Sequence, residues 1–105
     1  MNLLNLINDL ITQLDALIRA TSDPFQQAQL TKLRDAFDAM SDQAVHQLFD
    51  SSSADFGTAV SALQNASAAA NQGVADISKV AGAINSAVTA ANSVDKVLGF
   101  LAHIA

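Results

Sequence analysis

The sequence predicts an all-α fold, a bundle of helices in a single domain over residues 1–105, on three observations. Half of the 105 residues are apolar and only 14% are charged, which excludes the disordered class and suits one hydrophobic core. Apolar residues recur at steps of three and four through the first half of the chain. A seven-residue apolar repeat then runs from Phe56 to Leu98 without a phase shift.

The first helix is expected over about residues 2–20. Its apolar residues fall on one face, and polar residues fill the other. The helix should end at Thr21, because Pro24 cannot continue it, and Ser22 or Asp23 can cap the helix that follows. The expected apolar face consists of Leu3, Leu4, Ile7, Leu10, Ile11, Leu14, Leu17 and Ile18.

The second helix is expected over residues 24–49, before the turn-forming run Asp50-Ser51-Ser52-Ser53. Its stripe consists of Leu30, Leu33, Phe37, Met40, Ala44 and Leu48. The opposite face carries Asp35, Asp38, Asp42 and His46, which share one side of the helix. We interpret these four as a solvated acidic face, since one straight helix encloses a metal ion poorly.

Residues 54–103 carry the strongest periodicity. Three parallel heptad lines begin at Phe56, at Ala59 and at Val60, and they predict a helix of nearly 50 residues. Such a helix would be about 75 Å long, and the first two helices could cover only about half of it. Either it breaks near residues 71–74, where Gly73 could end a helix, to give a four-helix up-down bundle. Or it stays whole and another chain covers the remainder. The sequence leaves both arrangements open.

Charge divides the chain into two halves. Residues 1–55 hold eight aspartates against Arg19, Lys32 and Arg34, so the whole net charge of −5 lies there. The second half is rich in alanine, and its charges sum to zero. The acidic balance argues against nucleic-acid binding. The lack of cysteine excludes disulfide and thiolate-zinc sites. Because no catalytic constellation is present either, we expect a protein that is not an enzyme and uses no cofactor and no metal.

We therefore predict association as the function, either self-association into a homo-oligomer or binding of a protein partner, through the charge-poor C-terminal half. An alternative is a protein that binds a hydrophobic ligand or a membrane surface. The interface residues predicted from the heptad lines are Phe56, Val60, Leu63, Ala70, Ile77, Ile84, Val88, Ala91, Leu98 and Leu101.

The N-terminus lacks the basic region of a secretory signal, so the default expectation is a soluble cytoplasmic protein, with signal-less export left open. Residues 10–38, a helix, the turn Ser22-Asp23-Pro24 and a second helix, resemble the hairpin of type III secretion needle subunits. The composition, without Trp or Cys, is also similar to that of exported helical appendage proteins. This resemblance implies a further alternative, a subunit of an exported helical assembly.

Overall fold

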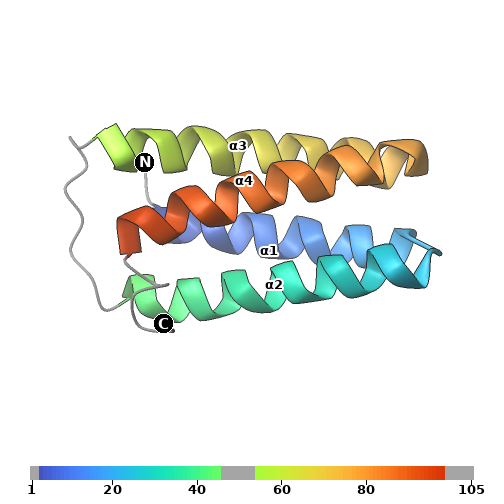
Figure 1. The fold of residues 1–105 in the computed structure, drawn as a ribbon, viewed down its shortest axis with the longest axis horizontal. Helices are drawn as coiled ribbons and strands as arrows, with labels where there is room; N and C mark the ends of the chain where they lie inside the picture. Colours follow the sequence, from blue (N-terminus) through green and yellow to red (C-terminus); the bar gives the residue numbers. More distant parts are fainter. Residues whose placement is uncertain (1–2, 46–53, 99–105) are drawn as a thin grey trace.

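The computed structural model describes residues 3–45 and 54–98. These described residues form four α-helices, α1 (Leu3–Ala20), α2 (Pro24–Val45), α3 (Ala54–Ala75) and α4 (Val80–Leu98), with a short 3-10 turn, η1 (Ile77–Lys79), before α4. No strand occurs in these two segments. Successive helices run in opposite directions along the long axis of the molecule (Figure 1). The all-α bundle predicted from the sequence is therefore confirmed, in its four-helix form.

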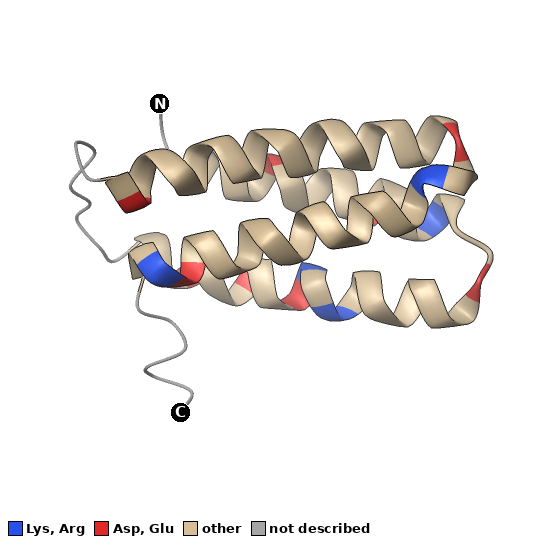
Figure 2. Cartoon of the chain, turned by 45° about the horizontal axis from the view of Figure 1, so that its top comes forward, with Lys and Arg blue, Asp and Glu red and all other residues tan. Residues whose placement is uncertain are grey.

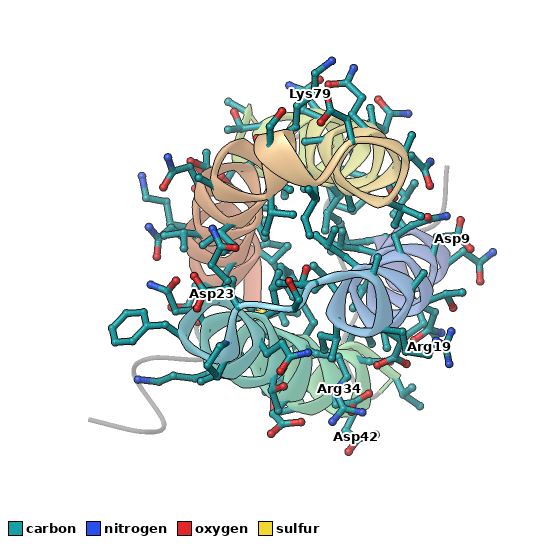
Figure 3. All side chains as sticks on the ribbon, turned by 90° about the vertical axis from the view of Figure 1, so that its right-hand side faces the viewer. Asp9, Arg19, Asp23, Arg34, Asp42 and Lys79 are labelled. Carbon is teal, nitrogen blue, oxygen red and sulfur yellow. The ribbon has the colours of Figure 1, made fainter. Side chains whose placement is uncertain are left out.

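The helices occupy the corners of a square when viewed down the bundle (Figure 3). The antiparallel neighbours are α1 with α2 and α3 with α4, so each is a hairpin of consecutive helices. The two hairpins meet through α1 against α3 and α2 against α4, and these neighbours run parallel. As a result, α2 ends and α3 begins at diagonally opposite corners.

The helix α1 buries the face that its sequence predicts, namely Leu3, Ile7, Leu10, Leu14 and Leu17. It ends at Ala20, and the next residue, Thr21, is buried, with a hydroxyl that donates a hydrogen bond of 2.7 Å to the Leu17 carbonyl. Asp23 caps α2, because its Oδ1 accepts a hydrogen bond of 2.9 Å from the Phe25 N–H, and Pro24 occupies the first helical position. Both turn signals read from the sequence are confirmed.

The predicted stripe of α2 is also buried at Leu30, Phe37, Met40 and Ala44. Outside the core, Arg34 pairs with Asp15 of α1 at 3.5 Å and with Asp35 at 3.1 Å, so the first hairpin is bridged at its surface as well. Leu48 and the predicted helix end at residue 49 lie outside the described residues.

Of the two arrangements left open for residues 54–103, the broken helix of a four-helix bundle is confirmed, and the whole helix is not formed. The break lies at residue 76, however, two residues beyond the expected range of 71–74. Helix α3 continues through Gly73 to Ala75, and the chain turns at Asp76, the one residue between 54 and 98 that is outside a helix. Asp76 has φ −143° and ψ 104°, and its Oδ1 accepts hydrogen bonds from the Ser78 N–H at 3.1 Å and the Ser78 hydroxyl at 2.7 Å. Residues 99–103 lie outside the described part.

The core changes character between the two hairpins. The first hairpin contributes mostly large side chains, whereas half of the buried apolar residues of α3 and α4 are alanine. The best-buried heptad line is the one that begins at Ala59 and continues as Ala66, Gly73, Val80, Ala87 and Val94. Small residues on this line allow α3 and α4 to approach each other and α1 closely.

Candidate interaction surface

The structure divides the predicted interface residues into three groups. Five lie in the core of the chain's own bundle, where at most 8% of each residue is exposed, and these are Phe56, Leu63, Ala70, Ile84 and Leu98. Val60 and Ala91 are half-buried and pack against that core, while Ile77 and Val88 are 53% and 42% exposed. Leu101 lies outside the described residues. In the closed bundle, therefore, most of the predicted seam faces this chain and not a partner.

The outer surface of α3 and α4 carries no charge along most of its length. The charged residues of the segment 54–98 are Asp55, Asp76, Lys79, Asp95 and Lys96, all at helix ends or at the turn. Residues 56–75 and 80–94 contain none. Figure 2 shows the contrast with the first hairpin, whose helices carry charged positions along their length.

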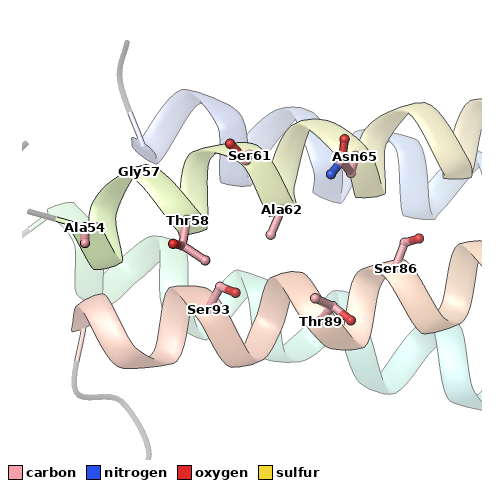
Figure 4. A pocket seen from close by; sticks show the side chains of 9 residues that line it. All are labelled: Ala54, Gly57, Thr58, Ser61, Ala62, Asn65, Ser86, Thr89 and Ser93. Carbon is pink, nitrogen blue, oxygen red and sulfur yellow. The ribbon is translucent and has the colours of Figure 1, made fainter.

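A groove of about 590 Å³ runs along this uncharged surface between the two helices, and we call it the α3–α4 groove. Its walls are formed by residues with small side chains, and many of these side chains carry a hydroxyl group (Figure 4). The lining residues are Ala54, Gly57, Thr58, Ser61, Ala62, Asn65, Ser86, Thr89 and Ser93. Because none of these side chains is large, the space between the outer edges of α3 and α4 is left open to solvent. The groove can offer hydrogen bonds but no charge to an incoming chain.

The polar walls of the α3–α4 groove were not among the predicted site residues. A signal was present in the sequence, because Thr58, Ser61 and Asn65 are spaced by three and four residues, as are Ser86, Thr89 and Ser93. Two polar stripes with the same spacing, on two helices that form a hairpin, indicate two edges that face each other. The interface was predicted from the apolar heptad lines, and most residues on those lines face the inside of the bundle.

A second, smaller groove of about 310 Å³ lies between α2 and α4. It joins two predicted interface residues, Ile84 and Val88, to Leu33 and Ala36 of α2, with Gln29 and Lys32 beside them. We call it the α2–α4 groove. Its walls are mainly aliphatic, so it differs in chemistry from the α3–α4 groove.

The acidic face of α2 has the exposure expected of it. Asp35, Asp38 and Asp42 are exposed, and Asp35 is paired with Arg34, which leaves it poorly placed to bind an ion. Within residues 3–45 and 54–98, no group of three His, Cys, Asp or Glu side chains is arranged to hold a metal ion. His46 and His103 lie outside the described residues.

Comparisons with protein-family models, with curated proteins and with solved structures find no match for this chain. None of the helices in the described segments combines the length and the apolar character needed to cross a membrane. The features of the described residues that bear on function are the two grooves and the uncharged face of α3 and α4.

Proposed function

We propose that this protein acts by association with another protein chain through the outer face of α3 and α4. The simplest partner is a second copy of the same chain, because no other molecule is then required. The observation that carries the proposal is the α3–α4 groove, which has a volume of about 590 Å³ and lies on a surface without charged side chains. The centres of protein interfaces are depleted of charged residues, because charged groups lose more hydration free energy on burial than hydroxyls or amides do.

The small residues of the groove support the same face, because they would let a partner helix approach at the short end of the usual interhelical range. Exposed large apolar side chains do not distinguish between the two hairpins. Phe25 and Val45 of α2 are 74% and 60% exposed, and Val74, Ile77 and Val88 of the segment 54–98 are between 42% and 53% exposed.

The test is a pair of matched substitutions. Thr89 of α4 lines the groove, and Thr12 of α1 lies on a helix across the bundle diagonal from α4. Both are exposed, and the hydroxyl of each donates a hydrogen bond of 3.2 Å to the carbonyl four residues earlier. Thr89→Lys and Thr12→Lys therefore introduce the same charge in the same local setting, and only the first places it at the proposed interface.

Light scattering at several concentrations then gives the solution mass of each protein. We expect the unaltered chain and Thr12→Lys to gain mass as concentration rises, and Thr89→Lys to stay at the monomer mass. Far-UV circular dichroism of both variants checks that the helices are retained. Monomer mass for the unaltered chain at every concentration would overturn self-association, and equal masses for the two variants would overturn this face as the interface.

The α2–α4 groove supports a second candidate function, the binding of a small apolar ligand. Its volume of about 310 Å³ and its aliphatic walls, formed by Leu33, Ala36, Ile84 and Val88, fit a short hydrocarbon. An environment-sensitive dye should then bind at high salt, and Val88→Asp should weaken that binding. If dye emission is unchanged by the protein, this candidate is rejected.

A further inference from the structure

We propose that the α3–α4 hairpin opens at Asp76 into one continuous helix, and that α4 then docks into the bundle of a second copy, to give a domain-swapped dimer. This inference rests on the proposed self-association but places the new contacts at the hinge and not in the α3–α4 groove, so a swapped dimer should form in Thr89→Lys as well. The two arrangements that the sequence leaves open, a broken helix and a whole helix covered by another chain, would then be two states of the same molecule. The open helix over residues 54–98 would be about 68 Å long.

The hinge is a single residue. Asp76 has extended backbone angles, while α3 ends directly before it and η1 leads directly into α4. Val80 already has helical angles of φ −61° and ψ −40°. Residues 74–81 include neither Gly nor Pro, so nothing in their sequence prevents a helix through the turn. Opening therefore requires Asp76 to move to helical angles and to release the two hydrogen bonds from Ser78.

The heptad phase is the second observation. Gly73, a buried residue near the end of α3, and Val80, the first buried residue of α4, are seven residues apart. A hairpin does not require this spacing, because each of its helices can carry an independent phase. A continuous helix does require it, because only then do the buried stripes of α3 and α4 lie on one face.

The third observation that supports the swap is the exposure of the Ile77 side chain. It is 53% exposed in the hairpin, yet it stands midway between Ala70 and Ile84, both buried, on the same heptad line. In the continuous helix Ile77 would share their face. An ideal Cβ on Gly73 lies 3.7 Å from the Ala83 Cβ, which centres the pairing of the two helices near residue 78. In the swapped dimer, Ile77 of each chain would thus lie beside the twofold axis and become covered.

The contacts of α4 would be kept in this dimer. The partner's α4 would take the same place against α2 and α3, and the partner's first hairpin would receive α4 in return. The new contacts would form only around the hinge, where Ile77 lies. Exchange of an identical element is a low-cost route to a dimer for this reason, and a short hinge favours it.

Two substitutions at the hinge act in opposite directions. Ile77→Pro suits the hairpin, because proline is tolerated at the first position after a cap and the residue before it favours the extended angles that Asp76 has. The same proline would interrupt the continuous helix, so the dissociation constant of the dimer should rise more than about 100-fold. Asp76→Ala removes the acceptor of both Ser78 hydrogen bonds and should lower that constant about tenfold.

Ile77→Ala is the control for the side chain alone. It removes the apolar group without restricting the backbone, so it should weaken the dimer by less than Ile77→Pro does. Circular dichroism at low concentration checks that each variant keeps its helices. If Ile77→Pro dimerises as tightly as the unaltered chain, the swap is wrong.

A cysteine pair distinguishes the swap from docking between closed bundles. The chain has no cysteine, and Thr58 and Ser93 point toward one another across the α3–α4 groove (Figure 4). In the double variant Thr58→Cys/Ser93→Cys, a closed bundle would form the disulfide within one chain. In a swapped dimer the facing cysteines belong to different chains, so oxidation of the isolated dimer fraction should give a covalent dimer on a non-reducing gel.

The outcomes separate the two proposals. Dimers that yield interchain disulfides support the swap. Dimers that yield only intrachain disulfides overturn the swap and leave the proposed self-association standing. A chain that is monomeric at every concentration overturns the self-association itself, and the swap with it.

Discussion

Gly73 of α3 lies directly against Leu17 of α1, because a Cβ built on Gly73 would be 2.9 Å from the Leu17 Cδ1 atom. Real Cβ atoms essentially never come this close to another heavy atom. Both residues are buried, and they join the two hairpins where α1 and α3 run parallel. The absence of a side chain at residue 73 therefore sets how closely the second hairpin packs on the first.

Substitution of Gly73 should reveal this contact in a double-mutant cycle. We expect Gly73→Ala to change the free energy of unfolding by less than about 1 kcal/mol, because its gain in helix propensity offsets the displacement of the Leu17 tip. In a Leu17→Ala background, which itself costs about 2–5 kcal/mol, the same change should stabilise by about 1 kcal/mol. Urea unfolding followed by circular dichroism measures both, and strictly additive effects would contradict the contact.

Gly82 of α4 provides the matched case without a neighbour. Nothing lies within 4 Å of a Cβ built there, and the residue is exposed. Gly82→Ala should therefore stabilise the protein by about 0.5–1 kcal/mol through helix propensity alone. A loss of stability in the same urea experiment would show that the outer side of α4 is not open.

The turn at Asp76 should make stability depend on pH in the acidic range. Hydrogen bonds from the Ser78 side chain and backbone hold the pKa of Asp76 below its ordinary value of 3.8, and Lys79 adds a smaller effect in the same direction. Because the pKa is lowered in the folded state, the contribution is present above the unfolded-state pKa and is lost as pH falls through the folded-state pKa. Unfolding curves of the unaltered chain and of Asp76→Ala should therefore converge on acidification. A constant difference between them at all pH values would contradict this role.

Ile84 and Val88 form a matched pair on one turn of α4. Ile84 is 7% exposed and belongs to the core, whereas Val88 is 42% exposed, and both line the α2–α4 groove. Ile84→Asp buries an unpaired charge and should lower the free energy of unfolding by about 3 kcal/mol or more. Val88→Asp should change it by less than about 1 kcal/mol. Thermal unfolding of both variants measures this, and equal losses would show that α4 is rotated from its position in the bundle.

The first hairpin could be predicted from the sequence because its signals act locally. Leucines and isoleucines at steps of three and four define the buried face of α1, and Asp23 with Pro24 marks the start of α2 within one residue. The amphipathic contrast is large in α1, since its opposite face is polar. No contact with another helix is needed to interpret it.

The second hairpin could not be placed in the same way. Glycine is the usual signal for a helix end, but Gly73 is buried within α3 because Leu17, 56 positions earlier in the chain, occupies the space of a side chain. The real turn depends on Asp76 and Ser78, two residue types that favour caps and turns but also occur inside helices, so their presence alone does not mark a helix end. The heptad phase also continues unbroken across the turn, so the apolar pattern does not indicate where the turn lies.

The site was predicted only in part for a related reason. Apolar heptads identify residues that need cover, but they do not say whether the cover comes from the same chain. Once α3 and α4 fold back, Phe56 and Leu63 are covered internally, and the surface left outside is the polar edge lined by Thr58 and Ser93. Which face remains outside depends on where the turn lies, so an error in the turn shifts the predicted site as well.

The parallel contacts between the two hairpins bear on how the molecule folds. Within each hairpin the partners are near in sequence, so loop closure there costs little entropy and should be fast. The contacts of α1 with α3 and of α2 with α4 join residues roughly half the chain apart. We therefore expect docking of two preformed hairpins to limit the folding rate. A chain whose second hairpin has not yet docked would display its alanine face to any neighbour, which makes the interval before docking the moment when two copies can exchange helices.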